Sequence, residues 1–320
     1  MKKSLALIFG LLLSCSVFAK SYSVFKYDNK YGVIDSNRKV VLSPQYEKIT
    51  RNEEFFFFCY DSTGKIDIYN STVKLIHSLP EDTSITRYSD YEYLVKEKSS
   101  KPFYLLNLKT GEISDYEKSK EYVWNYSYVD GLALVLEMNA KNADYSIVDK
   151  KGNVVLQNIE QANFYYSEGM LAVQMSDGSS GFVDKTGKFV IKTSFYRNLE
   201  DEGPRKSPSI QYFFNEGLAI VQSEKDVWEI FDTKGKKVQI PDSIQVVARY
   251  FSNKLVVIVD KNNKYGYMNP KAEVAIPYKF DSASNFIGDY AMVVYDSKDA
   301  VVDSKGRIYF CEEIMKKNKL

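Results

Sequence analysis

Large apolar residues occupy every second position from 171 to 175, which is the period of a strand with one buried face. The following residues, 178–181, have the sequence GSSG and predict a turn. Two further short strands are predicted at 182–184 and 188–191, with a tight connection between them. The pattern therefore predicts a three-stranded meander, and residues 194–196 are a candidate short fourth strand.

The tight connection in this meander has the sequence Asp184-Lys185-Thr186-Gly187. A carboxylate at the first position can accept a hydrogen bond from the backbone two residues on, and the glycine can take a positive φ without steric cost. Related turns recur about eight times, roughly 34 to 48 residues apart, which is the period of a repeat protein. The closest copies are Asp149 to Gly152, Asp232 to Gly235 and Asp303 to Gly306; weaker copies lie at 108–111, Asp35 to Arg38, 70–73 and 269–272.

A second marker precedes the units, consisting of an aromatic residue, a short acidic or glycine turn and a small apolar strand. It occurs at 128–135, 213–221 and 286–294. One such unit cannot bury its own apolar face, so successive units must pack on each other. The sequence predicts an all-β fold of tandem β-meander repeats with about eight units. A β-propeller-like ring is favoured because four strands per roughly 40 residues is the content of one blade, and an open β-solenoid is the alternative.

Two segments depart from the half-buried strand pattern. The run 55–60 is apolar on both faces, which predicts an inner strand buried between neighbours. Residues 312–319 predict a helical turn in a chain with few other helix signals.

These repeats resemble the WG (KWG) repeat of bacterial proteins, in which an aromatic-glycine pair is followed by an apolar strand, an aspartate turn and a second apolar strand. The clearest copies begin at Tyr31-Gly32, at Gly181-Phe182 and at Tyr265-Gly266, with tyrosine in place of the namesake tryptophan at the first and third. Trp228 lies at the corresponding position of another unit but lacks the glycine. The resemblance implies a binding or surface role and supplies no catalytic residues.

The first nineteen residues have the features of a signal peptide: Lys2 and Lys3, an apolar run, and a small-residue cleavage site ending at Ala19. The apolar run is too short for a permanent membrane helix. We expect export with removal of residues 1–19, periplasmic or extracellular localisation, and a single repeat domain over residues 20–320. The residues around Cys15 also resemble a lipoprotein signal, which leaves lipid anchoring as an alternative.

Cysteine and histidine are scarce in the chain after residue 19. Cys59 and Cys311 either form a disulfide, favoured by an oxidising compartment, or are two separate buried thiols. The one histidine, His77, lies in a strand-like run without a recognisable triad, and so few ligands do not make a zinc site. No phosphate-binding glycine motif is present. A formal net charge of +1 argues against nucleic acid as a partner. We therefore expect no enzyme activity and no cofactor.

Two groups of residues are candidates for binding. The segment 197–211 is rich in charge, glycine and proline and predicts an exposed loop, with Arg197, Glu200, Asp201, Arg205 and Lys206 as candidate contacts. Tyrosines and one tryptophan crowd the segments that enter the units, where they either pack across strands or contact a ligand: Tyr122, Trp124, Tyr126, Tyr128, Tyr165, Tyr166 and Tyr212.

The favoured hypothesis is an exported, non-enzymatic scaffold that binds an unknown protein or an envelope component. A lectin-like protein that binds glycans through tyrosines is the first alternative. A propeller hydrolase with paired carboxylates is the second, although aspartates repeated in every unit are better explained by turn geometry.

Overall fold

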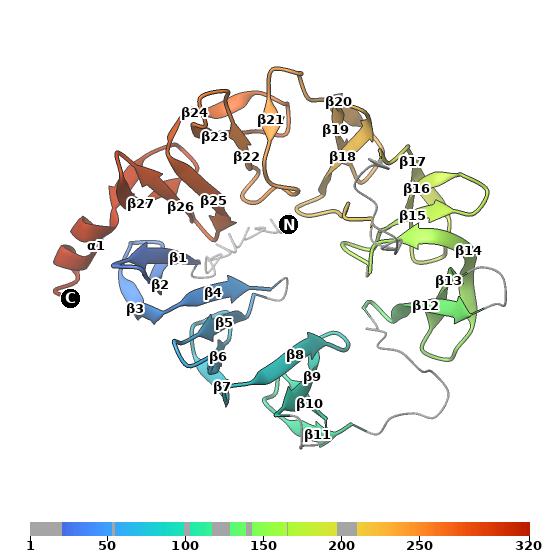
Figure 1. Cartoon of the computed structure of the whole chain (residues 1–320), viewed down its shortest axis with the longest axis horizontal. Coiled ribbons are helices and arrows are strands. Elements are labelled where there is room, and N and C mark those ends of the chain that lie inside the picture. The colour runs from blue at the N-terminus through green and yellow to red at the C-terminus, as the bar shows by residue number, and fades with distance from the viewer. Residues whose placement is uncertain are drawn as a thin grey trace, which may run out of the picture.

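The computed structural model describes residues 21–52, 55–98, 103–116, 129–138, 143–164, 166–196 and 210–320. In this part of the chain antiparallel strands form seven sheets that follow one another around a ring, as in a β-propeller (Figure 1). The predicted all-β meander fold is confirmed, and the ring is the architecture formed rather than the open solenoid. No helix in the described part of the chain has the length and apolar character that a membrane crossing needs.

Each sheet consists of strands that are consecutive in the sequence. The first sheet contains β1 (Tyr22–Tyr27), β2 (Lys30–Asp35) and β3 (Val40–Tyr46). The second contains β4 (Lys48–Arg51), β5 (Phe57–Tyr60), β6 (Ile66–Tyr69) and β7 (Leu75–Leu79). The third contains β8 (Thr83–Arg87), β9 (Glu92–Glu97), β10 (Tyr104–Asn107) and β11 (Ile113–Asp115).

The fourth sheet has six strands: β12 (Leu132–Met138), β13 (Ala143–Asp149), β14 (Val154–Ala162), β15 (Leu171–Met175), β16 (Ser180–Val183) and β17 (Phe189–Lys192). The fifth contains β18 (Leu218–Glu224), β19 (Val227–Asp232) and β20 (Lys237–Gln239). The sixth contains β21 (Gln245–Val246), β22 (Val256–Val259), β23 (Tyr265–Met268) and β24 (Val274–Phe280). The last contains β25 (Ser282–Ile287), β26 (Tyr290–Tyr295), β27 (Lys298–Asp303) and β28 (Ile308–Phe310), and α1 (Cys311–Lys317) follows it.

The six-stranded sheet explains why about eight predicted units give seven sheets. Its strands β12–β14 and β15–β17 are two meanders, and the nine-residue β14 pairs with both β13 and β15. At the corresponding places elsewhere the strand is interrupted, at Glu47 between β3 and β4 and at Asp281 between β24 and β25. The meander at 171–191 forms as predicted, whereas residues 194–196 form no strand, although Tyr196 N donates to Gln222 O at 2.8 Å.

The glycine of the aromatic-glycine pair is required by a close approach of two strands. A Cβ atom on Gly32 would lie 2.5 Å from the carbonyl oxygen of Leu42, and one on Gly266 would lie 2.6 Å from that of Ile276. In both places the register shifts opposite the glycine, which marks a β-bulge. A side chain at either position would push the bulged strand away.

Most of the core consists of apolar clusters between neighbouring sheets, whereas the cluster from Leu132 to Val183 lies within the six-stranded sheet. The run predicted to be apolar on both faces contributes to clusters between sheets: Phe57 and Cys59 are fully buried, and Phe56 and Phe58 pack toward the third sheet. The strand of this run, β5, lies between β4 and β6 in its sheet.

The ring closes where the first sheet meets the last sheet and α1, which we call the closing joint. No sheet of the described residues combines strands from both ends of the chain, so side chains make this joint. Its cluster contains Phe25, Ile34, Tyr290, Val301, Cys311, Ile314 and Met315. Helix α1 lies where the sequence predicts a helical turn, and its acidic first turn and basic last turn suit the helix dipole.

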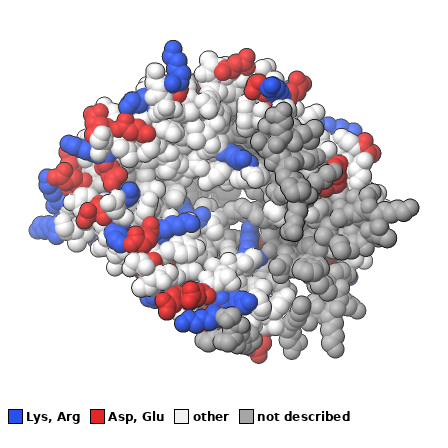
Figure 2. All heavy atoms as spheres, viewed as in Figure 1, with Lys and Arg blue, Asp and Glu red and all other residues white. Residues whose placement is uncertain are grey.

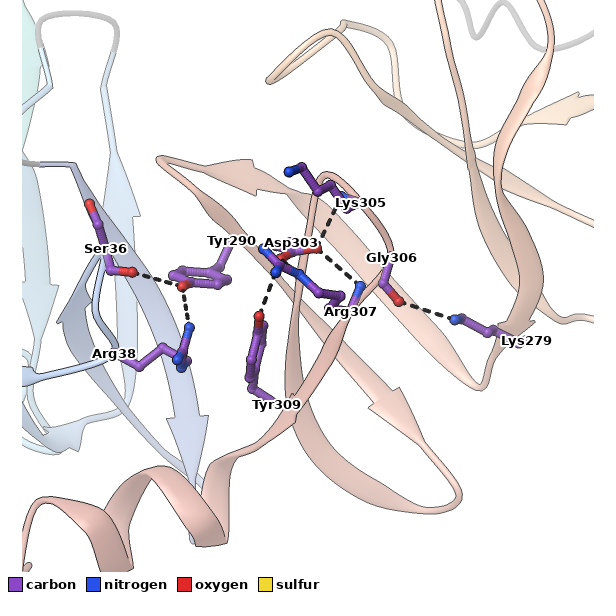
Figure 3. A network of polar contacts seen from close by, with 9 residues as sticks. All are labelled: Ser36, Arg38, Lys279, Tyr290, Asp303, Lys305, Gly306, Arg307 and Tyr309. Carbon is purple, nitrogen blue, oxygen red and sulfur yellow. Dashed lines mark hydrogen bonds and ion pairs between the residues drawn. The ribbon is translucent and has the colours of Figure 1, made fainter. Parts of the chain in front are cut away.

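Polar contacts complete the closing joint (Figure 3). The Arg38 guanidinium lies over the Tyr309 ring at 4.0 Å and donates to Tyr290 Oη at 2.8 Å. Tyr290 Oη in turn donates to Ser36 O at 2.8 Å. Beyond the figure, Asn318 Oδ1 accepts from Val40 N at 3.0 Å. Burial raises the pKa of Tyr290, which keeps its hydroxyl protonated and able to donate.

The disulfide left open by the sequence is not formed. Cys59 and Cys311 are free and buried, Cys59 in the cluster between the first and second sheets and Cys311 in the cluster under α1. The ring does close, but Cys59 on β5 and Cys311 at the start of α1 lie in different clusters. Burial raises the pKa of each thiol to about 12, so both are protonated at neutral pH.

The third and fourth sheets meet in a different way, at what we call the β11–β12 joint. Asp130 N donates to Asp90 Oδ1 across it at 3.3 Å. None of the apolar clusters formed by the described residues includes side chains from both sheets; one ends at the third sheet and another begins at the fourth. The chain segment between the two sheets, 117–128, lies outside the described residues.

Candidate binding surface

Short turns lie around the centre of the ring, each directly before one of the strands β5, β9, β12, β15, β18 and β22 (Figure 1). We call them the central turns: 52–56, 89–92, 129–132, 167–170, 215–218 and 252–255. Each is closed by hydrogen bonds between its first and last residues or next to them. Two of them, 129–132 and 215–218, lie within copies of the second sequence marker, in which a turn is followed by a small apolar strand.

Hydrogen bonds connect central turns of neighbouring sheets. Ser167 Oγ donates to Phe214 O at 2.6 Å, and Asn215 Nδ2 donates to Phe251 O at 2.6 Å. Carboxylates repeat the pattern: Glu168 accepts from Gly217 N at 2.8 Å, and Glu216 accepts from the backbone N–H groups of the next turn at 2.7 Å. These charge-assisted bonds fix the relative height of neighbouring sheets and make the rim of the ring rigid.

The aspartate turns predicted from the sequence lie on the same face as the central turns, because Leu132 pairs with Asp149 and Leu218 pairs with Asp232. In each turn one carboxylate oxygen accepts from the backbone N–H groups two and four residues on, for Asp35, Asp149, Asp184, Asp232 and Asp303. The glycine that ends four of them has a positive φ: Gly152, Gly187, Gly235 and Gly306.

The pKa values of three turn aspartates are lowered by the hydrogen bonds. For Asp184 the main cause is the Thr186 hydroxyl, followed by backbone N–H groups. For Asp149 it is the Asn153 amide. Burial alone would raise the pKa of Asp303, but hydrogen bonds from the Arg307 backbone and guanidinium hold it below its ordinary value. These carboxylates are ionised and engaged within their own turns.

Two central turns carry exposed aromatic side chains where other central turns carry glycine. The last-but-one residue has a left-handed φ in all of these turns, and it is Gly131, Gly169 and Gly217 in three of them. In the second and third sheets it is Phe55, with φ 67° and 55% exposed, and Tyr91, with φ 63° and 37% exposed. A bulky residue in this conformation costs about 1–2 kcal/mol relative to glycine.

An arginine lies beside Phe55, and a lysine lies beside Tyr91. Arg51 is half-buried, and its guanidinium is 4.5 Å from the Phe55 ring and 5.4 Å from the Phe57 ring. Its Nε is buried without a hydrogen-bond partner among the described residues, and burial lowers the pKa of Arg51 to about 10. Lys109 Nζ lies 5.3 Å from the Tyr91 ring. We call Arg51, Phe55, Tyr91 and Lys109 the aromatic-cationic patch.

Two acidic residues of the turn 89–92 have partners. Asp90 accepts from Asp130 N and lies 3.8 Å from Arg87, and Glu92 accepts from the Ser89 hydroxyl at 2.5 Å. Over the face drawn in Figure 2, basic and acidic side chains are interspersed, and basic side chains border the hollow at its centre. Arg51 Nε has no hydrogen-bond partner among the described residues, and Glu53 and Glu54, in the same turn as Phe55, lie outside them.

A polar groove of about 780 Å³ lies elsewhere, between β17 and the strands β19 and β20. Its floor contains Ile191 and Phe231, and its walls carry Lys192, Lys234, Lys237, Glu224, Glu229 and Gln239. Lys237 Nζ donates to Glu229 at 2.7 Å, which neutralises this buried carboxylate. The groove is thus suited to a polar ligand.

The residues predicted as binding contacts are only partly placed. Arg197, Glu200, Asp201, Arg205 and Lys206 of the predicted loop lie outside the described residues, as do Tyr122, Trp124, Tyr126, Tyr128 and Tyr165. Tyr166 is buried, and Tyr212 stacks on Phe195 at 5.1 Å, so these two pack within the fold. His77 lies on β7, and no group of three or more metal-ligating side chains occurs among the described residues.

The sequence does not single out the aromatic-cationic patch. The second and third units are recognised in it chiefly by their spacing, so their central turns are not aligned with the others. A usable signal is present nonetheless: Phe55 and Tyr91 replace a glycine that the marker keeps in other units.

Comparison with known protein families identifies three of the repeat units. A family model described as the WG containing repeat matches residues 31–54, 145–178 and 265–298. The chain contains WG repeats at these three places. Each matched WG repeat begins at a tyrosine, Tyr31, Tyr145 or Tyr265, that lies in the second strand of a meander. The aromatic-cationic patch lies on the second and third sheets, and only β4 of those sheets is within a matched repeat.

Comparison with solved structures gives matches that cover most of this chain. Apo AztD of Citrobacter koseri is 14% identical over 91% of this chain and 94% of that one, with a TM-score of 0.46. Hsv2 of Kluyveromyces lactis is 11% identical over 82% and 90%, with a TM-score of 0.40. BamB of Moraxella catarrhalis is 11% identical over 89% and 92%, with a TM-score of 0.38. A comparison with curated proteins gave no sequence match.

Proposed function

We propose that this WG-repeat protein is an exported, non-enzymatic scaffold that binds a protein partner of the cell envelope through the face bearing the central turns. The first nineteen residues support export, because they have the charged start, apolar run and small-residue end of a signal peptide. A rigid β ring with short exposed turns is the kind of scaffold on which binding residues are presented.

The observation that carries the proposal is the exposure of Phe55 and Tyr91 at positions taken by glycine in three other turns. A strained backbone conformation that persists without benefit to the fold is characteristic of functional sites. Tyr, Phe and Arg are also enriched in the buried centres of protein interfaces. The patch supplies all three residue types on two neighbouring turns.

The test is affinity capture from envelope extract with the wild-type protein and with a Phe55→Gly/Tyr91→Gly variant. Glycine restores the residue that the other turns use, so the variant keeps the turn conformation. Loss of the captured partner is expected, with the melting temperature unchanged or raised by a few degrees. A Leu75→Ser/Val190→Ser variant is the matched control, because both side chains are exposed apolar residues on outer strands away from the patch.

Capture of the same partners by the wild-type and glycine variants would contradict the proposal. The predicted loop is tested in parallel by deleting residues 197–209. If that deletion alone abolishes capture, the loop and not the central face is the binding site.

A glycan-binding role is the second candidate, and the polar groove between β17 and β20 favours it. Lysine, glutamate, glutamine and hydroxyl side chains line the groove over an apolar floor, which suits the hydroxyl groups of a sugar. Its lining contains no tyrosine among the described residues, unlike the glycan sites expected from the sequence. A glycan array probed with wild type and with Lys234→Ala/Gln239→Ala tests this role; signals unchanged by the substitutions would exclude the groove.

A further inference from the structure

Glu229 occupies a position that other repeats give to glycine. It follows Trp228 on β19, whereas Gly32 and Gly266 follow a tyrosine at the same place in two of the matched repeats. Opposite those glycines the strand ladder has a β-bulge, and a Cβ atom on the glycine would lie 2.5 or 2.6 Å from a carbonyl oxygen. Strands β19 and β20 pair without a register shift. The regular ladder therefore leaves room for the side chain of Glu229.

The two-residue period of a strand determines which side chains accompany Glu229. Phe231 lies on the same face of β19. On β20, Gln239 lies opposite Glu229, and Lys237 lies two residues before Gln239. All four side chains line the polar groove of about 780 Å³ between β17 and the strands β19 and β20. Small-ligand sites typically measure about 300–1,000 Å³, so the groove has the size of such a site.

The carboxylate of Glu229 is buried but only partly satisfied. Its side chain is 9% exposed, and Oε1 accepts from Lys237 Nζ at 2.7 Å. The described residues make no other hydrogen bond to this carboxylate, although an ionised carboxylate can accept about four. A buried acceptor without a donor destabilises the fold, and a buried ion pair seldom offsets that cost by itself. The free oxygen is thus suited to a donor that enters the groove.

Lys234 supplies a positive charge at one end of the groove. It belongs to the turn 232–235, and a Cβ atom on Gly235 would lie 3.4 Å from Ile191 of β17, so this turn closes that end. The Lys234 ammonium group forms no ion pair with the described residues. The carboxylate of Asp232 in the same turn accepts from backbone N–H groups.

The opposite end of the groove carries one charge of each sign. Strands β17 and β18 both begin on the face of the central turns, so Lys192 at the end of β17 and Glu224 at the end of β18 lie toward the other face. Lys237 is engaged by Glu229, which leaves the positive charge of Lys234 in excess. The groove therefore favours a ligand that carries hydroxyl groups along its length and a negative charge at one end.

We propose that this groove binds an acidic saccharide. Sugar hydroxyls donate to the free oxygen of Glu229 and accept from the amide of Gln239, which lies directly opposite on the neighbouring strand. The acidic group of the sugar pairs with Lys234, and the C–H groups of the ring lie over the apolar floor of Ile191 and Phe231. This inference rests on the glycan-binding candidate and specifies the charge of the glycan and the residues that recognise it.

The experiment begins with a glycan array that holds neutral, uronic-acid, sialylated and sulfated glycans, probed with the chain lacking residues 1–19. Acidic glycans are expected to give the strongest signals. Isothermal titration calorimetry then compares the best acidic glycan with its neutral counterpart, which is the methyl ester of a carboxylated sugar or the desulfated form of a sulfated one. The wild type is expected to bind the acidic form at least tenfold more tightly, by a margin that narrows as the salt concentration rises.

Lys234→Met keeps the apolar stem of the side chain and removes its charge. This variant is expected to bind the acidic and neutral forms equally. Lys271→Met is the matched control, because Lys271 occupies the same place in the turn 269–272 of the sixth sheet and does not line the groove. The control should retain the wild-type preference for the acidic form.

Glu229→Gln tests the buried carboxylate. It replaces an acceptor oxygen by an amide donor, so binding of the acidic and neutral forms should weaken alike, at least tenfold. Its melting temperature is measured alongside to confirm that it folds. If it does not fold, the comparison of the two ligand forms on the wild type and on Lys234→Met still decides the proposal, because neither protein alters the buried pair.

Three outcomes would overturn the proposal: stronger array signals from neutral glycans, equal binding of the two ligand forms by the wild type, or an unchanged preference in Lys234→Met. Pentaglutamate is titrated as a probe that has carboxylates without sugar hydroxyls, and binding as tight as that of the acidic glycan would also overturn it. Neutral glycans that bind through the groove would overturn this inference and keep the glycan-binding candidate, whereas no glycan binding at all would overturn both. The envelope capture experiment tests the central-turn face independently of these results.

Discussion

The closing joint and the β11–β12 joint both connect neighbouring sheets of one ring, but they are built differently. The closing joint has a buried cluster from Phe25 to Met315 and polar contacts through Arg38 and Asn318. At the β11–β12 joint Asp130 N reaches Asp90, and no apolar cluster of the described residues spans it. The two sheets at the β11–β12 joint are adjacent in the sequence, whereas the closing joint unites segments more than 250 residues apart. The side-chain contacts of the closing joint offset the entropy of closing so long a loop.

The largest expected effect is at the closing joint. Phe25→Ala removes a fully buried ring that packs against α1 and β27, and should lower the free energy of unfolding by about 3–5 kcal/mol. Urea denaturation followed by far-ultraviolet circular dichroism measures it. A loss below about 1 kcal/mol would show that the ring does not depend on this joint.

A smaller effect is expected from the polar contacts of the same joint. Arg38→Met should cost about 1–2 kcal/mol, because it removes a charge-assisted hydrogen bond to Tyr290 and the contact with Tyr309. Tyr290→Phe removes the hydroxyl alone. A double-mutant cycle of the two should give a coupling energy of about 0.5–1.5 kcal/mol. Additive effects would show that the bond contributes nothing to closure.

The carboxylate of Asp303 is expected to make the stability of the last sheet depend on pH. Its folded pKa is lowered, so the stability it contributes is present above its unfolded pKa of about 3.9 and is lost as the pH falls through the folded value. Asp303→Asn should cost about 1 kcal/mol at pH 7. The difference from wild type should shrink below about pH 4. Urea midpoints measured at pH 7, 5 and 3 check this, and a difference that grows toward low pH would contradict it.

The smallest effect is expected at the β11–β12 joint. Asp90→Asn should change the free energy of unfolding by less than about 0.5 kcal/mol, because the carboxylate is partly exposed and its contacts at 3.3 and 3.8 Å are long. Hydrogen exchange sharpens the contrast: backbone amides of β12 should exchange faster than those of β1. Equal protection of both strands would mean that the two joints open with similar free energies.

Much of this architecture follows from local patterns. The alternation at 171–175 and the turn that begins at Asp184 are sufficient to predict a meander, because strand period and turn geometry are set within a few residues. The number of sheets could not be predicted in this way. Glu47, Glu160 and Asp281 occupy corresponding places in three units, yet Glu47 and Asp281 lie between two strands and Glu160 lies within β14. That outcome depends on packing against both neighbouring sheets and is not contained in the residue type.

The site was harder to predict than the fold. In a repeat protein, a candidate functional residue stands out when it differs from the residue that the other repeats have at the same position. Such a difference can be recognised only after all the repeats have been aligned. The units that carry Phe55 and Tyr91 have lost most of the shared residues, so the departures were hidden where the pattern was weakest. The sequence did predict loops on a rigid scaffold as binding elements, with the charged segment 197–211 as the candidate loop, and it did not point to the short central turns.

The unbroken strand β14 has a consequence for how such rings change in size during evolution. Glu47 and Asp281 interrupt the strand between one sheet and the next. Duplicating or losing a repeat at such a boundary separates two sheets that contact each other through side chains. At β14 the same event would cut a ladder of backbone hydrogen bonds between two meanders. Insertions and deletions of whole repeats should therefore accumulate at the interrupted boundaries, while the pair of repeats joined by β14 is inherited as one piece.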